Sequence, residues 1–217
     1  MDPARADALL ARLSEARVLW LLHVNADADC VGSAVALVEA FGGDVGAPDG
    51  VARPARGVAE EAGLVVDPWP HPENYDVVVA VDTSSRSQLG RMGARVPAPC
   101  LVDHHRYGDL LETAPAAAWD PARASCAEVA LALVERAGRA PSPRAAKALL
   151  AGLVADSARF RFADAPALET AARLVRLSGA SVEEVVARME REEPEDGGEG
   201  DDVERRHASL VAATRAK

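Results

Sequence analysis

The chain has 217 residues, of which 49% are hydrophobic and 4% aromatic, and a formal net charge of −10. This length suits one α/β domain, with or without an extra lobe. The acidic charge argues against binding to duplex nucleic acid, which relies on basic patches.

The N-terminal segment, MDPARADALLARLSEAR, carries acidic residues in an amphipathic pattern. It lacks the basic region and the apolar region of a signal peptide. No stretch of the chain reaches the roughly 18 uninterrupted apolar residues that a membrane span needs. The sequence therefore predicts a cytoplasmic protein. Cys30, Cys100 and Cys126 are widely spaced and odd in number, which indicates neither a disulfide framework nor a zinc knuckle.

Apolar periodicity predicts helices and strands that alternate along the chain. The first half is expected to form a helix over 3–17 and then the buried strand RVLWLLH over 17–23. Further helices are expected over 32–41 and 54–62, with strands over 42–48, 63–67, 75–85 and 98–105. In the second half of the chain, helices are expected over 125–137, 143–154, 166–178 and 181–192. This order predicts an α/β fold with a doubly wound, mainly parallel sheet flanked by helices, and with helices at the C-terminal end.

Acidic residues and histidines follow three of the predicted strands. In an open parallel sheet, ligands bind beyond the carboxyl ends of the strands. If the three strands are neighbours, these side chains converge on one crevice. They are His23, Asp27 and Asp29, then Asp82, then Asp103, His104 and His105, with Asp156 after a later helix as a further candidate.

Such a group of carboxylates needs a cation, because close carboxylates repel one another. Carboxylate and imidazole ligands favour Mn²⁺, Mg²⁺ and similar divalent ions. Two ions about 3.5–4 Å apart can bind a phosphate, lower the pKa of a bridging water and stabilise the oxygen that leaves. Each residue taken alone is also typical of a helix cap or a turn. The recurrence of such groups at several element ends favours a two-metal centre.

Four segments, in order, resemble the motifs of the DHH phosphoesterase superfamily. They are HVNADADCVGSAVAL (23–37), VVVAVDTSS (77–85), VDHH (102–105) and LVADSARFRF (153–162). Two stretches, DPARASCAEVALALVE (120–135) and DSARFRF (156–162), are most similar to the branch of oligoribonucleases (nanoRNases) and 3′-phosphoadenosine-5′-phosphate (pAp) phosphatases. The resemblance covers roughly residues 1–190, which would form the DHH catalytic domain.

The resemblance implies a role for each candidate residue. The metal ligands would be His23 and Asp27 for the first ion, Asp29, His104 and Asp156 for the second ion, and Asp82 as the bridge between them.

The other candidates would act on the substrate. His105 would contact the scissile phosphate or protonate the leaving oxygen, and Asp103 would orient a histidine. Arg159 could approach a substrate phosphate. Ser125 is a candidate for substrate binding, although a helix N-cap is the stronger interpretation.

The implied cofactor is a pair of Mn²⁺ ions, with Mg²⁺ or Co²⁺ as alternatives. The implied function is hydrolysis of short oligonucleotides, or of the 3′-phosphate of pAp-like nucleotides. Alternatives are a cyclic-dinucleotide phosphodiesterase, a single-strand exonuclease, an inorganic pyrophosphatase, or a nucleotide-binding regulatory module with little catalysis. Expected partners are a short single-stranded oligonucleotide or a small phosphorylated nucleotide, and a second copy of the chain in a homodimer. Neither a membrane nor duplex DNA is expected.

The sequence departs from the family pattern in two places. Ala26 stands where the family usually has proline. The family's second domain carries a GGGH motif that grips the substrate, and no such motif occurs in this sequence. The charge-rich stretch REEPEDGGEGDDVE over 191–204 predicts an acidic flexible linker. Residues 205–217 are expected to start a helix that leads to a second domain.

Overall fold

The computed structural model describes residues 1–190. The expected linker over 191–204 and the expected helix over 205–217 lie outside the described residues. None of the described helices combines the length and the apolar character that crossing a membrane requires.

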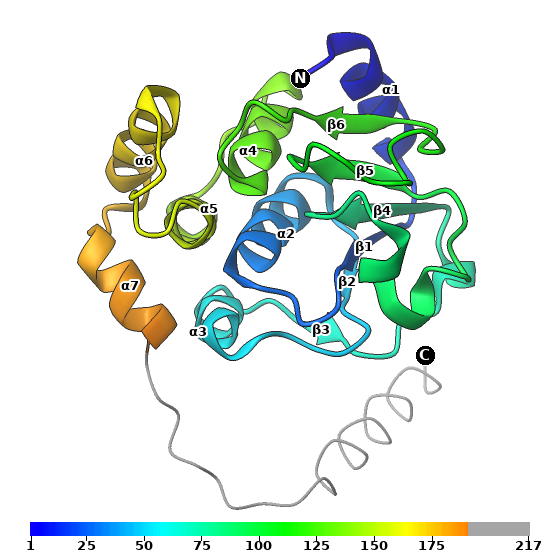
Figure 1. Ribbon diagram of the computed structural model, residues 1–217, viewed down its shortest axis with the longest axis horizontal. Helices are drawn as coiled ribbons and strands as arrows, with labels where there is room; N and C mark the ends of the chain where they lie inside the picture. The colour runs from blue at the N-terminus through cyan, green and yellow to red at the C-terminus, as the bar shows by residue number, and fades with distance from the viewer. Residues whose placement is uncertain (191–217) are drawn as a thin grey trace, which may run out of the picture.

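A six-stranded parallel sheet forms the centre of the molecule (Figure 1). Its strands, in the order β3-β2-β1-β4-β5-β6, all pair in parallel with their neighbours. The predicted α/β fold with a parallel sheet flanked by helices is therefore confirmed. The strands are β1 (Val18–Leu22), β2 (Asp44–Gly46), β3 (Val66–Asp67), β4 (Val77–Val81), β5 (Cys100–Asp103) and β6 (Ala117–Trp119).

Helices are stacked in layers on one side of this sheet (Figure 1). The helices α2 and α4 lie against the sheet, α5 packs behind α2, and α6 and α7 pack on α5. The seven α-helices of the described residues are α1 (Pro3–Leu13), α2 (Ala28–Phe41), α3 (Arg53–Glu61), α4 (Cys126–Arg136), α5 (Pro143–Asp156), α6 (Ala165–Ser178) and α7 (Val182–Glu190). Two short 3₁₀ helices, η1 (Pro72–Asn74) and η2 (Arg86–Met92), lie before and after β4.

The two faces of the sheet bury different sets of side chains, because successive residues of a strand point to opposite sides. Trp20 and Leu22 of β1 belong to the larger core, which includes the helices. Leu19 and Leu21 belong to a smaller core, which includes Leu89 of η2. These four residues of β1 are fully buried, which explains why the strand reads as an uninterrupted apolar run.

Two glycines let α2 and α5 approach each other closely. A Cβ atom on Gly32 of α2 would lie 2.2 Å from the carbonyl oxygen of Ala148 on α5. A Cβ atom on Gly152 of α5 would lie 2.6 Å from Oδ1 of Asp29 on α2. No larger residue fits at either position without displacing backbone. This close contact fixes the first turn of α2 against the last turns of α5.

Candidate metal centre

Five polar side chains meet at the carboxyl edge of the sheet. His23, Asp82 and His104 directly follow the neighbouring strands β1, β4 and β5, so the parallel pairing places them side by side. The first turn of α2 adds Asp29, and the last residue of α5 adds Asp156. The strand ends and the contact between α2 and α5 therefore build one site from five distant parts of the chain.

Asp82 lies at the centre of this group. Its Oδ2 atom is 3.7 Å from Nε2 of His23, and its Oδ1 atom is 3.5 Å from Nε2 of His104. Its backbone has a φ of 58°, a left-handed conformation that is uncommon for a residue other than glycine. A carboxylate that offers one oxygen to each of two histidines has the geometry of a bridging ligand.

Further carboxylates surround each histidine. Oδ2 of Asp156 is 3.1 Å from Nε2 of His104, and Oδ2 of Asp29 is 4.0 Å from the same atom. On the other side, Oδ1 of Asp27 is 3.8 Å from Nε2 of His23. The six predicted metal ligands therefore occupy one region, in the two groups that the resemblance implies.

The thiol of Cys30 joins the first group, although it is not among the residues predicted from the sequence. One donor atom from each of Cys30, His23 and Asp82 lies within 4.8 Å of the other two. Its S–H group donates to the carbonyl oxygen of Val81 at 3.3 Å. A lone cysteine on an apolar helix face carries no sequence signal for metal binding, so only the structure reveals this position.

Both histidines direct Nε2 into the site, because Nδ1 is occupied by a main-chain carbonyl. Nδ1–H of His23 donates to the oxygen of Val24 at 2.8 Å, and Nδ1–H of His104 donates to the oxygen of Arg123 at 3.4 Å. A hydrogen bond of this kind fixes the tautomer that leaves the Nε2 lone pair free for a metal ion.

Asp29 is fully buried and is held by the first turn of α4. Its carboxylate accepts hydrogen bonds from the backbone N–H groups of Cys126 at 2.6 Å and Ala127 at 2.8 Å. Burial raises the pKa of the Asp29 carboxyl well above its usual value, and the charges of Asp82 and Asp156 raise it further. The helix N-terminus offsets part of this cost, since it favours negative charge.

Donor atoms and charges in this site fit a divalent cation. Oδ1 of Asp82 and Nε2 of His104 are buried, yet within residues 1–190 neither has a hydrogen-bond partner. Burial by itself lowers the pKa of His104, but the carboxylates of Asp156 and Asp82 outweigh it and raise that pKa to about 11. A positive charge is therefore strongly favoured here, and it can come from protons or from metal ions.

His105 and Asp103 form a pair beside the ligand groups. Nδ1–H of His105 donates to Oδ1 of the fully buried Asp103 at 2.7 Å. This hydrogen bond is the largest of the effects that raise the pKa of His105. The His105 side chain is 41% exposed, so its Nε2 can reach a substrate.

The two predicted substrate-binding residues lie apart from this pair. Arg159 lines a hollow next to Asp27, and its guanidinium forms an ion pair with Glu190. Ser125 is fully buried and caps α4, where its Oγ accepts a hydrogen bond from the N–H of Glu128 at 3.4 Å. Ser125 thus supports the helix turn that holds Asp29.

A comparison with protein families gives a match to the description "DHH family, N-terminal domain" over residues 17–154. The chain belongs to the DHH family. The matched segment runs from β1 to the last turns of α5 and so contains every candidate metal ligand except Asp156, which lies two residues beyond it. The DHH family is one of metal-dependent phosphoester hydrolases, as the four motifs imply.

One relative is similar in sequence, and solved structures share this fold. The chain is 28% identical over 215 residues to the uncharacterized protein MJ0988 of Methanocaldococcus jannaschii, and the match spans 95% of this chain and 62% of that relative. An exopolyphosphatase-related protein from Bacteroides fragilis superposes with a TM-score of 0.74 at 16% identity, over 89% of this chain and 62% of that one. A "putative family II inorganic pyrophosphatase" of Methanococcus jannaschii superposes with a TM-score of 0.64 at 20% identity, over 79% of this chain and 59% of that one.

Proposed function

We propose that the chain is the catalytic domain of a Mn²⁺-dependent phosphoesterase that hydrolyses short oligonucleotides or the 3′-phosphate of pAp-like nucleotides. The observation that supports this proposal best is the position of Asp82 between His23 and His104. Oδ1 of Asp82 and Nε2 of His104 are buried there without a hydrogen-bond partner among the described residues. The motifs at 120–135 and 156–162, which resemble the oligoribonuclease and pAp phosphatase branch, support the substrate class.

The residues around the site have distinct tasks in this proposal. His23, Asp27 and Asp82 would hold one ion, and Asp29, His104, Asp156 and Asp82 would hold the other. When bound, such an ion pair neutralises the charge of a phosphate and lowers the pKa of a water molecule.

His105 would supply the proton for the leaving oxygen. Asp103 holds its Nδ1–H, so the ring presents Nε2 to the substrate in one orientation. The raised pKa of His105 increases the protonated fraction near neutral pH, which suits a general acid. Asp103 acts through His105 and is a positioning residue.

The test is a substrate panel on the full-length protein with Mn²⁺. We expect release of AMP from the dinucleotide pApA or of phosphate from pAp, and weaker activity on pyrophosphate and cyclic dinucleotides. Asp82→Asn should lower the metal content below two ions per chain. It should also reduce turnover at least about 100-fold, since even the outer partners of metal ligands are worth 10–100-fold.

Other results would favour the alternatives. Preference for pyrophosphate or for a cyclic dinucleotide would contradict the proposed substrate class but remain consistent with the two-metal mechanism. Nucleotide binding without hydrolysis at any Mn²⁺ concentration would favour a regulatory module. Unchanged turnover in Asp82→Asn would contradict the two-metal proposal itself.

A further inference from the structure

A groove with a volume of about 370 Å³ opens beside the metal centre. Its size lies within the range of roughly 300–1,000 Å³ that is usual for small-molecule sites. Three segments supply its walls: the residues after β5, the turn before α4, and the connection between α5 and α6. Since His104 and His105 belong to its lining, a ligand in the groove lies next to the proposed reaction site.

The groove has one arginine that is available to an anion, while its one carboxylate, Asp164, caps α6 by accepting a hydrogen bond from the N–H of Ala167 at 2.9 Å. Arg106 is exposed and lines the groove, and within residues 1–190 it makes neither an ion pair nor a hydrogen bond. Arg123, also in the lining, is held in place by Asp120 at 3.5 Å and Glu128 at 3.4 Å. Arg106 therefore offers its guanidinium donors to a ligand, with no competing contact in the part of the chain that the structure describes.

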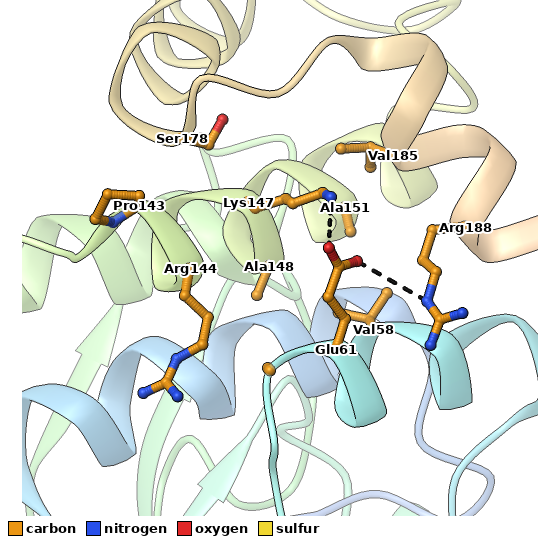
Figure 2. Close-up of a pocket in the computed structure, with 11 residues that line it drawn as sticks. Val58, Glu61, Pro143, Arg144, Lys147, Ala148, Ala151, Ser178, Val185 and Arg188 are labelled. Atoms are coloured by element: carbon orange, nitrogen blue, oxygen red, sulfur yellow. Dashed lines mark hydrogen bonds and ion pairs between the residues drawn. The ribbon is translucent and has the colours of Figure 1, made fainter.

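In a second hollow, unlike in this groove, carboxylates pair with the positively charged side chains. Between α3, α5 and α7, Figure 2 shows Glu61 between Lys147 and Arg188. The Lys147 ammonium lies 2.5 Å from Glu61, and Arg188 also pairs with Glu60 at 3.0 Å. The positive charges there are already neutralised by carboxylates, so that hollow gives no comparable reason to bind an anion.

An aromatic ring, that of Phe162, also lines the groove. Phe162 is 72% exposed, although burial of a phenyl ring is normally favourable. The turn before it is unusual, because Ala158, Arg159 and Phe160 have φ values of 49°, 59° and 67° in succession. Phe162 itself is fixed by a hydrogen bond from its N–H to the carbonyl oxygen of Ser157 at 3.0 Å. The ring is therefore presented to solvent by a hydrogen-bonded turn, with the guanidinium carbon of Arg161 5.7 Å from its centroid.

We propose that this groove binds one nucleotide unit of the substrate, with the base stacked on Phe162 and a phosphate held by Arg106. This subsite rests on the proposed function, which places the scissile phosphate at the metal centre. Stacking of a base on an aromatic ring contributes about 5- to 150-fold in affinity and tolerates any base. Arginine matches a phosphate through two parallel hydrogen bonds. The preferred substrate class is then nucleotidyl phosphoesters, because pyrophosphate and polyphosphate have no base to stack.

The test compares two ligands that differ only in the base. Calorimetry on the full-length, Mn²⁺-loaded protein measures binding of 5′-AMP and of ribose 5-phosphate. We expect 5′-AMP to bind at least about fivefold more tightly, the lower end of the stacking contribution. Phe162→Ala should reduce the affinity for 5′-AMP to that for ribose 5-phosphate, while Phe162→Trp should keep the difference. Arg106→Gln should lower the affinity for 5′-AMP and the affinity for ribose 5-phosphate by a similar factor.

Trp69→Ala is the matched control, because Trp69 is a half-exposed aromatic with Arg91 stacked 3.7 Å from its ring centroid, next to the far edge strand β3. It should change neither affinity. Equal binding of the two ligands by a protein that hydrolyses pApA would overturn the subsite and leave the proposed function intact. Failure to load Mn²⁺ or to hydrolyse any panel substrate would overturn the proposed function, and the subsite with it.

Discussion

Asp82 occupies a backbone conformation that is unfavourable for its side chain. A left-handed residue other than glycine costs about 1–2 kcal/mol, and here the carboxylate is also buried without a hydrogen-bond partner for Oδ1 within the described residues. Strain of this kind persists where it serves a function. With this φ of 58°, the carboxylate lies between His23 and His104, at 3.7 and 3.5 Å from their Nε2 atoms.

Asp82→Gly should remove metal binding and leave the stability of the metal-free protein close to that of the wild type. We expect the free energy of unfolding in EDTA to stay within about 1 kcal/mol of the wild-type value, because relief of the left-handed strain is offset by loss of the charge pairs of Asp82 with His23 and His104. The stabilisation that Mn²⁺ gives the wild type should vanish. Urea unfolding with and without Mn²⁺ measures both effects.

Glu15→Gly is the control for this substitution, since Glu15 is exposed, has a φ of 59° and lies before β1. It should raise the free energy of unfolding in EDTA by about 1 kcal/mol through the backbone alone and leave the effect of Mn²⁺ intact. A wild-type Mn²⁺ effect in Asp82→Gly would show that Asp82 is not a ligand.

His105→Ala should separate metal binding from chemistry. One donor atom of His105 lies within 4.8 Å of donor atoms of Asp82 and His104, but its Nδ1–H is held by Asp103. Each proposed ligand group has at least three other donors, so the metal content should stay at the wild-type value. The single-turnover rate should fall about 10²- to 10⁴-fold, which is the usual contribution of a general acid. Metal analysis by mass spectrometry and rapid-quench kinetics check the two parts.

His71→Ala is the matched control for the loss of an imidazole, because His71 is exposed and the one polar partner of its ring within the described residues is Glu73. It should change neither the metal content nor the rate. Loss of metal in His105→Ala would instead assign His105 to the ligands, a role that its 3.9 Å distance from Oδ1 of Asp82 allows.

At the scale of the elements, the contact between α2 and α5 decides where Asp29 lies relative to Asp156. Gly152→Ala would place a Cβ atom 2.6 Å from Oδ1 of Asp29 and 2.9 Å from its Cα. Because Asp29 is fully buried and tied to α4, the helices must separate. We expect a loss of about 1–3 kcal/mol in unfolding free energy, as for other overpacked cores, and weaker Mn²⁺ binding.

Gly138→Ala serves as the comparison for this prediction. Gly138 has a φ of 71°, and a Cβ atom added there would have no neighbour within 4 Å. Alanine should therefore cost about 1 kcal/mol through the backbone alone. Calorimetric titration with Mn²⁺ should then give the wild-type affinity for Gly138→Ala and a lower affinity for Gly152→Ala. Equal affinities would show that the helix contact does not control the site.

The elements also show what the sequence can predict. β1 and β4 are long apolar runs that the sequence predicts correctly, because buried parallel strands lack alternation. The sequence does not predict β6. Its three residues, Ala117–Trp119, include two alanines with low strand propensity, and they extend only because they pair with β5. The predicted start of α2 at residue 32 is wrong, since Asp27 caps this helix and Ala28 begins it.

The sequence also predicts the candidate metal centre only in part. The rule that ligands gather at strand ends predicts the convergence of His23, Asp82 and His104. It does not predict the carbonyl of Arg123 that orients His104, or the N–H of Cys126 that holds Asp29. Both contacts use main-chain groups, which nearly every residue type offers equally. Sequence therefore identifies the candidate ligands but not the main-chain groups that hold their side chains.

For the whole molecule, the excess of negative charge at one edge of the sheet couples folding, protons and metal. In the metal-free protein the pKa of His104 is raised to about 11, so this ring is protonated at pH 7. A raised pKa contributes stability that is fully present below the unfolded value of 6.5 and is lost as pH rises towards 11. The metal-free protein should thus become less stable as pH increases from about 6 to about 8.

The metal-loaded protein should respond in the opposite direction. A metal ion must displace the proton from Nε2 of His104 and any proton on the buried Asp29 carboxyl, so Mn²⁺ binding releases protons and becomes tighter as pH rises. Each proton released is worth up to about tenfold in affinity per pH unit. The increase in Tm caused by a fixed excess of Mn²⁺ should therefore be larger at about pH 8 than at about pH 6, and calorimetry in buffers of different ionisation enthalpy should detect the released protons. An increase in Tm that is equal at both pH values, with no proton release, would mean that Mn²⁺ binds somewhere other than among these carboxylates and histidines.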